Sequence, residues 1–123
     1  MTRGMVALVV GLGVAGCATE PPAPGEFRVV KAHAMSAFAV HEECMRVSAG
    51  ERIEYVFEST EPLHFDIHFR AGGATLLPLS QDGVREGAAV YPVLESQILC
   101  LGWEASAAGA RLDYRFRIRR PET

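Results

Sequence analysis

A strict alternation of apolar and polar residues in two stretches most constrains how this chain can fold. Between residues 63 and 70 every second residue is apolar, from Leu63 to Phe69, and histidine, aspartate or arginine stands between them. Residues 111–119 repeat the pattern, with arginine or aspartate as the polar partner. A period of two is that of a β-strand, and it turns one face to a core and the other to water. The alternation therefore predicts an antiparallel all-β fold.

Further strands are predicted from shorter apolar or alternating runs. They cover residues 27–31, 40–47, 53–58, 74–79, 84–91 and 96–103. Glycine, aspartate or proline falls between many of these runs, which is typical of a β-sandwich or barrel. Only the alanine-rich stretch 33–38 favours a helical turn. We therefore expect one antiparallel sandwich or barrel over residues 26–123.

The N-terminal stretch has the features of a targeting segment. Its GxGxxG pattern at residues 11–16 matches dinucleotide-binding folds, but three prolines at 21–24 stand where such a fold needs a helix. Instead, Arg3 precedes an apolar run, 5–15, that ends in small residues, as in a secretory signal peptide. The run is shorter than the roughly 20 apolar residues that span a bilayer. We therefore expect it to be removed.

The end of this run, Val14-Ala15-Gly16-Cys17, resembles the bacterial lipobox. The resemblance implies that cleavage leaves Cys17 first, with a diacylglyceryl thioether and an amino group acylated by a fatty acid such as palmitate. Two or more acyl chains anchor a protein stably, whereas one does not. Ala18, rather than aspartate, is similar to the version sent to the outer membrane. We expect a signal peptide (1–16), a Pro-rich membrane tether (17–25) and an outer-membrane lipoprotein that faces the periplasm.

Composition bounds the function of the mature chain, 17–123. It is long enough for one core and too short for two. Removing Arg3 from the 12 Lys and Arg leaves 11 basic residues against 15 acidic ones, a formal charge of −4. Such a surface argues against nucleic acid as a partner. The sequence also contains no GxSxG, HExxH or GxxxxGK motif, so we expect no catalysis.

Two cysteines, Cys44 and Cys100, remain once Cys17 is assigned to lipid. Two thiols of an exported domain normally pair in an oxidising compartment. A bridge across their 56-residue separation stabilises a fold by about 4 kcal/mol on the chain-entropy model. The alternative is a metal thiolate or a redox-active thiol, although no CxxC spacing accompanies either cysteine.

The run CMRVSAGERIEYVFESTEPLHFDIHFRAGG, followed later by SQILCLGWEAS and LDYRFRIR, resembles the GOLD domain, the lumenal β-sandwich of the emp24/p24 cargo receptors. The similarity covers nearly all of residues 40–119. It implies a sandwich of seven or eight strands, a Cys44–Cys100 disulfide and a protein-interaction role without catalysis. No coiled coil, transmembrane helix or sorting tail follows residue 119 in this sequence. Vesicle cargo selection is therefore not expected to carry over.

His64, Asp66 and His68 are one candidate metal-binding group, because they share a face of one strand. The two histidine Cα atoms are about 13 Å apart, too far to share one ion without a bulge. Either histidine would instead join Asp66 and a ligand from a neighbouring strand. The alternative is a solvated face on which these side chains meet the arginines of 111–119 across the sheet.

His33, Met35 and His41, with Met45 nearby, form a second candidate group. Imidazole and thioether ligands together suit copper. Methionine is also a common core filler, which is the alternative for Met45 in particular. Copper sequestration or delivery is therefore the alternative function, with His64 or His68 as further ligands.

Two other features have a binding interpretation beside a structural one. Trp103 is either an exposed binding anchor or the cap of the sandwich core. The arginines of 115–120 either meet lipid phosphates or form the water-facing side of the last strand. The sequence thus predicts a non-catalytic, lipid-anchored envelope protein that binds a protein or a small ligand and needs no cofactor.

Overall fold

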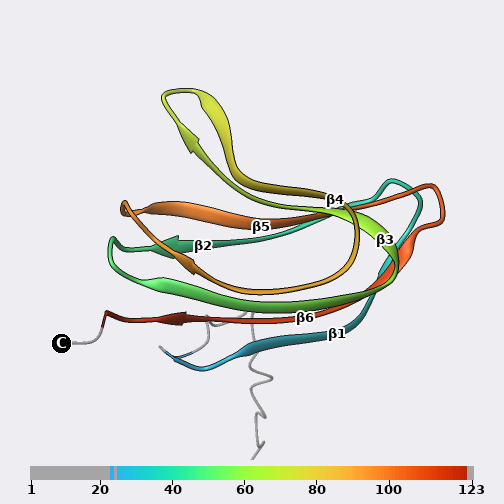
Figure 1. Cartoon of the computed structure of the whole chain (residues 1–123), viewed down its shortest axis with the longest axis horizontal. Coiled ribbons are helices and arrows are strands. Elements are labelled where there is room, and N and C mark those ends of the chain that lie inside the picture. The colour runs from blue at the N-terminus through green and yellow to red at the C-terminus, as the bar shows by residue number, and fades with distance from the viewer. Residues whose placement is uncertain (1–22, 24, 122–123) are drawn as a thin grey trace, which may run out of the picture.

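The computed structural model describes residue 23 and residues 25–121, and Figure 1 shows their arrangement. Six strands make up the fold: β1 (Arg28–Met35), β2 (Val40–Val47), β3 (Arg52–Ala71), β4 (Ala74–Pro92), β5 (Gln97–Ala105) and β6 (Ala110–Arg119). The predicted all-β antiparallel fold is confirmed. No described residue belongs to a helix of the length and apolarity needed to cross a membrane. The predicted signal peptide and Cys17 lie outside the described residues.

The number of strands in the described chain is six because two pairs of predicted strands are continuous. Residues 53–58 and 63–70 are the two halves of β3, which has 20 residues, and 74–79 and 84–91 lie in the 19-residue β4. Pro62 lies inside β3, where the pairing with β4 is irregular between Glu58 and Leu63. Proline is tolerated in a strand at such an irregularity, because no ladder hydrogen bond is lost there.

Each half of β3 pairs with a different neighbour. Residues Arg52 to Ser59 pair with β6, residues Leu63 to Phe69 pair with β5, and β4 follows the other edge of β3. The strand order is β1-β6-β3-β5-β2, and β4 pairs with β3 outside this order. We call β1, β6 and the first half of β3 layer A, and we call β2, β5 and the second half of β3 layer B. The sheet bends in the middle of β3, so that the two layers face each other.

The core lies between the two layers and consists of the apolar positions of the alternation. The rings of Phe57 in layer A and Phe65 in layer B have centroids 4.6 Å apart. Trp103 is 1% exposed and contacts the rings of Phe57, Phe65 and Tyr114. Its interpretation as an exposed binding anchor is therefore wrong, because β5 turns Trp103 inward together with Leu99 and Leu101. Trp103 is the centre of the core instead.

The predicted helical turn at 33–38 is also wrong, because β1 continues to Met35 and a turn follows. Inward-facing Met35 is 5% exposed, and its burial outweighs the helix propensity of the flanking alanines. In the turn, Phe38 has a φ of 59° and a side chain that is 65% exposed. Its backbone N–H donates to the carbonyl of Ser106 in the β5–β6 turn. The β1–β2 turn is thus fixed to the neighbouring turn.

Candidate functional site

A hairpin formed by the end of β3 and the start of β4 projects from the body of the molecule (Figure 1). The pairing of β3 with β5 ends at Phe69, so beyond this residue β3 pairs only with β4. Gly72 and Gly73 both have positive φ, and they make the tight turn at the tip. Leu76 and Leu77 are 45% and 48% exposed. We call residues 70–78 the projecting hairpin; all nine are exposed.

The outer surface of layer B carries a row of alternating carboxylates and imidazoles. His64 Nδ1 lies 2.5 Å from Asp82 Oδ1, and His64 Nε2 lies 3.3 Å from Asp66 Oδ2. The other oxygen of Asp66 lies 2.6 Å from His68 Nδ1. His68 Nε2 in turn lies 3.4 Å from Glu42 Oε1. These five residues form one connected chain across the layer, which we call the histidine–carboxylate row.

The strand register explains how the row forms. Gly102 of β5 lies opposite both Asp66 of β3 and Glu42 of β2. A Cβ atom on Gly102 would lie 2.8 Å from Asp66 Oδ1 and 3.3 Å from the ring of His68. Because glycine leaves this space open, the imidazole of His68 reaches across β5 to Glu42. The predicted alternative, contact with the arginines of 111–119, is wrong, since those arginines lie in layer A.

The row perturbs the titration of His64. The pKa of His64 is raised, chiefly by its hydrogen bond with Asp82 and against the effect of burial. Asp82 and Glu42 were not among the residues that the sequence singled out. Their contribution depends on which strands are neighbours, and a single strand's pattern does not reveal this. Asp66 contacts both histidines, and Asp82 of the neighbouring strand β4 contacts His64; metal binding by these residues stays a prediction.

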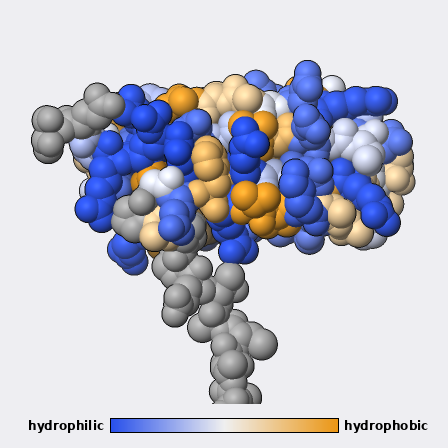
Figure 2. All heavy atoms as spheres, turned by 90° about the horizontal axis from the view of Figure 1, so that it is seen from below, coloured by the Kyte–Doolittle hydropathy of each residue, from blue (hydrophilic) through white to orange (hydrophobic). Residues whose placement is uncertain are grey.

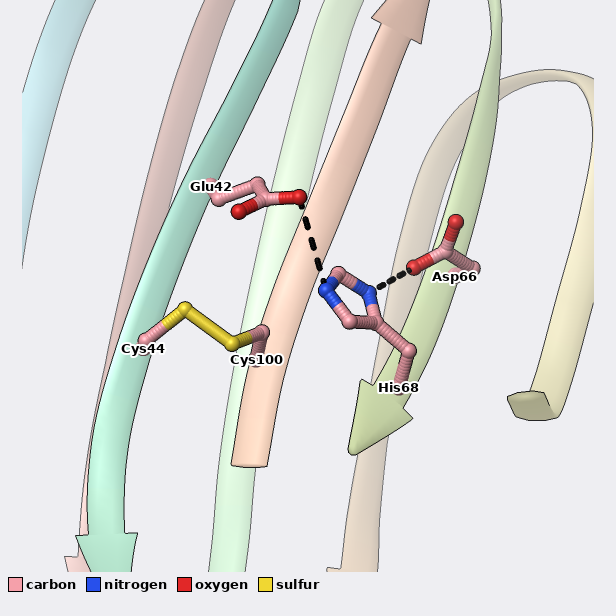
Figure 3. The surroundings of a disulfide bond; sticks show 5 residues. All are labelled: Glu42, Cys44, Asp66, His68 and Cys100. Atoms are coloured by element: carbon pink, nitrogen blue, oxygen red, sulfur yellow. Dashed lines mark hydrogen bonds and ion pairs between the residues drawn. A yellow bond between two sulfur atoms is a disulfide. The ribbon is translucent and has the colours of Figure 1, made fainter. Parts of the chain in front are cut away.

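The predicted disulfide between Cys44 and Cys100 is present beside this row. The two cysteines lie directly opposite each other on β2 and β5, and Cys100 is also opposite His68 on β3. Figure 3 shows His68 and Glu42 pointing toward each other next to the bridge. Cys44 is exposed, whereas Cys100 is 8% exposed. The disulfide therefore links the edge strand β2 to β5 on the water-facing side of layer B.

A second polar cluster closes the open side between β1 and β2. The ring centroids of His33 and His41 are 4.0 Å apart, and His41 Nε2 lies 2.8 Å from the hydroxyl of Tyr114. The Tyr114 hydroxyl donates to Glu43, which also accepts from Arg28 Nε. We call these five residues the β1–β2 polar cluster. Burial, followed by the charge of His33, lowers the pKa of His41.

The structure thus brings together two of the three residues predicted for copper. His33 and His41 are in contact, but the side chain of Met35 belongs to the core. Met45 is half-buried and packs against the same core. The imidazoles of His33 and His41 are half-buried, whereas the thioether of Met35 is buried. Met35 therefore does not lie with the two histidines as a third ligand.

The arginines of β6 lie on the outer face of layer A. Arg115 and Arg117 stack on the ring of Phe27, at 5.3 and 4.4 Å, and Arg117 also donates to Glu54 at 2.8 Å. Figure 2 views the molecule from the side of β1 and β6, where hydrophilic residues surround separate apolar patches. The N–H of Gly25 donates to the carbonyl of Ile118, so the chain enters the fold beside β6.

No protein-family model matches this sequence, and no curated protein is detectably similar to it in sequence. Among solved structures, the fold is similar to that of PliG from Aeromonas hydrophila, a periplasmic inhibitor of g-type lysozyme. The TM-score is 0.56 at 14% identity, over 76% of this chain and 86% of that one. A protein from Sulfurospirillum deleyianum matches with a TM-score of 0.44 and 9% identity, over 79% of this chain and 99% of that one. The likeness to PliG establishes a shared fold.

Proposed function

We propose that this chain is a non-catalytic, lipid-anchored protein of the bacterial envelope that binds another protein through its projecting hairpin. The exposed Leu76 and Leu77 carry this proposal, because they stand on a two-stranded ribbon with which no other strand of the described residues pairs. Exposed apolar side chains that lie together on a projecting element mark a candidate protein-interaction site. A ribbon of this shape fits into a cleft rather than onto a flat surface.

The fold supports a protein as the ligand. PliG has a similar fold and is an inhibitor of g-type lysozyme, so g-type lysozyme is the first partner to test. The GOLD resemblance, which also implies protein interaction, stays a prediction.

The position of the chain entry sets how a lipid anchor at Cys17 would orient the molecule. Ala23 lies six positions after Cys17, and six positions of extended chain span at most about 20 Å. Gly25 is held beside Ile118 in layer A, whereas the hairpin leaves from layer B. An anchored molecule would therefore keep layer A near the membrane and direct the hairpin away from it.

Calorimetry with g-type and c-type lysozyme tests the proposed binding. The mature chain would carry Cys17→Ser so that it stays unlipidated. We expect micromolar or tighter binding to one lysozyme, and at least tenfold weaker binding by a Leu76→Ser/Leu77→Ser variant. Leu94→Ser is the matched control, because Leu94 is 82% exposed but lies in the β4–β5 connection. Binding that survives the hairpin substitutions overturns the role of the hairpin, and no binding overturns this choice of partner.

Metabolic labelling with a fatty acid tests the anchor separately. The full chain expressed in a bacterium should incorporate the label and sediment with membranes. The Cys17→Ser variant should do neither. Labelling that persists in the variant contradicts acylation at Cys17.

Copper binding is the second candidate function, and the contact between His33 and His41 favours it. Native mass spectrometry with Cu(I) and Cu(II) tests it. We expect one copper ion per chain, lost in a His33→Ala/His41→Ala variant. An apo spectrum of the unchanged chain at micromolar copper rejects this function.

A further inference from the structure

The disulfide lies among side chains that are themselves metal ligands. A carboxylate oxygen of Glu42, a ring nitrogen of His68 and Sγ of Cys100 all lie within 4.8 Å of one another. Sγ of Cys44 lies outside this group of three but is bonded to Sγ of Cys100. Three potential donor atoms, one from each of β2, β3 and β5, therefore lie close together on the outer face of layer B, and the Cys44 sulfur is bonded to one of them (Figure 3).

These donor types, with the Cys44 thiolate added on reduction, match the preferences of Zn²⁺. This ion binds thiolate at about 2.3 Å and imidazole or carboxylate at about 2.0–2.2 Å, in a tetrahedron. Neighbouring ligand atoms in such a tetrahedron are about 3.3–3.8 Å apart, as these bond lengths require. The separations among Glu42, His68 and Cys100 are within a small side-chain movement of that geometry. Two sulfurs, one nitrogen and one oxygen would fill the coordination sphere.

Asp66 already orients His68 as a ligand. Its Oδ1 lies 2.6 Å from His68 Nδ1, which places the ring proton on Nδ1 when the histidine is neutral. The lone pair of Nε2 then faces Glu42 and the bridge. A carboxylate that holds the far nitrogen of a histidine is the usual support of a zinc-bound imidazole. Both side chains are only 17% exposed, so their packing fixes this arrangement.

The disulfide keeps the donors from acting together. Thiolate, and not disulfide sulfur, is the metal-binding form of cysteine. We propose that reduction of the Cys44–Cys100 disulfide creates a Zn²⁺ site formed by both thiolates, His68 and Glu42. The metal site and the disulfide are then alternative states of the same residues, and the redox state selects between them.

The chemical steps need a dithiol reductant and one metal ion. The dithiol attacks the exposed Cys44 sulfur, the Cys44–Cys100 bond breaks, and the dithiol is oxidised to its own disulfide. Two electrons and two protons pass to the cysteines in this exchange. Zn²⁺ then binds both sulfurs and releases the two thiol protons to water. Oxidation by a disulfide oxidant reverses both steps and expels the ion.

Native mass spectrometry of the mature chain carrying Cys17→Ser tests the proposal, with Zn²⁺ offered before and after reduction by a phosphine. We expect one Zn²⁺ per reduced chain and none per oxidised chain. Co²⁺ offered in place of Zn²⁺ should give a thiolate-to-metal charge-transfer band in the reduced chain. His68→Ala should weaken Zn²⁺ binding at least tenfold, and Asp66→Asn should weaken it about 10- to 100-fold through the loss of orientation.

Glu104→Gln is the matched control, because Glu104 is an exposed carboxylate of β5 opposite His64 but outside the donor group. It should bind Zn²⁺ as the unchanged chain does. Equal Zn²⁺ binding by the oxidised chain overturns the proposal, as does full retention by His68→Ala. If reduction alone unfolds the chain, added Zn²⁺ must restore the circular dichroism of the β-sheet. Failure to restore it also overturns the proposal.

Discussion

The hydroxyl of Tyr114 in layer A donates a 2.6 Å hydrogen bond to Glu43 in layer B. This donation uses its one proton, so the 2.8 Å contact with His41 must be a hydrogen bond from His41 Nε2 to the hydroxyl oxygen. One phenol thereby connects two side chains of β2 to β6 across the open side of the sandwich. The same interaction raises the pKa of Tyr114, after the larger effect of burial.

Replacing this hydroxyl should loosen the contact between the layers. We expect Tyr114→Phe to lower the free energy of unfolding by about 1–2 kcal/mol, because Glu43 and His41 lose a hydrogen-bond partner at a half-buried site. Urea denaturation measures the change. Tyr55→Phe is the control, since Tyr55 is equally buried, at 4% exposed, and makes no hydrogen bond with any described residue. Equal losses in both variants would contradict a specific role for Tyr114.

His64 should give the stability a pH dependence of known sign. Its pKa is raised in the folded state, so the protonated form stabilises the fold. This contribution is fully present below the ordinary histidine pKa of about 6.5, and it is lost as the pH rises through the raised value. The loss of stability caused by His64→Gln should therefore be larger at pH 5 than at pH 9.

Salt provides the check on this interpretation. The Asp82 side chain is 92% exposed, so salt should screen its interaction with His64 and shrink the pH-dependent difference. His41 has the opposite sign, because its pKa is lowered and its protonation destabilises the fold as the pH falls below about 6.5. If His64→Gln lowers the free energy of unfolding by the same amount at pH 5 and at pH 9, the proposed role of protonated His64 is rejected.

Gly87 should tolerate no side chain. It pairs with Phe57, and a Cβ on Gly87 would overlap the ring of this residue, which is 1% exposed. We expect Gly87→Ala to cost about 1–3 kcal/mol through overpacking. Glu86→Ala, one residue earlier and exposed, should change the midpoint of thermal unfolding little. A stable Gly87→Ala variant would mean that β4 does not pack on Phe57 as described.

At position 38, glycine should give a more stable protein than alanine, which is the reverse of the usual order. At ordinary strand and helix positions glycine is the less stable of the two by about 0.5–1 kcal/mol. The φ of 59° at Phe38 favours glycine, because a Cβ is strained in the left-handed region by about 1–2 kcal/mol. Phe38→Gly should therefore unfold at a higher denaturant concentration than Phe38→Ala. The side chain is mostly exposed, so both variants lose little burial.

The alternation that predicts the strands also predicts which residues form the core. Leu63, Phe65 and Ile67 are all 2% exposed or less, as a strand with one buried face requires. The local pattern could not reveal that β3 runs through Pro62, because this depends on the bend that joins the layers. Burial of Met35 likewise outweighed a local alanine preference in β1.

The candidate site was predictable only within one strand. The shared face of His64, Asp66 and His68 could be read from the alternation within one strand. The disulfide could be predicted because two cysteines remain once Cys17 is assigned to lipid. Glu42 joins His68 only because β2 is the second neighbour of β3 and Gly102 leaves the space between them open. The sequence pattern of β3 reveals neither the order of the strands beside it nor the absence of a side chain at Gly102 of β5.

The two layers draw on different parts of the sequence, so they become complete at different points along the chain. Layer B, the disulfide and the projecting hairpin use residues between Val40 and Ala105 only. Layer A pairs the first strand with the last, so β1 finds its partner only when residues 110–119 are available. Residues 40–105 thus contain every partner needed for layer B and its disulfide. Closure of layer A over Trp103 also requires residues 110–119, because β1 pairs with β6.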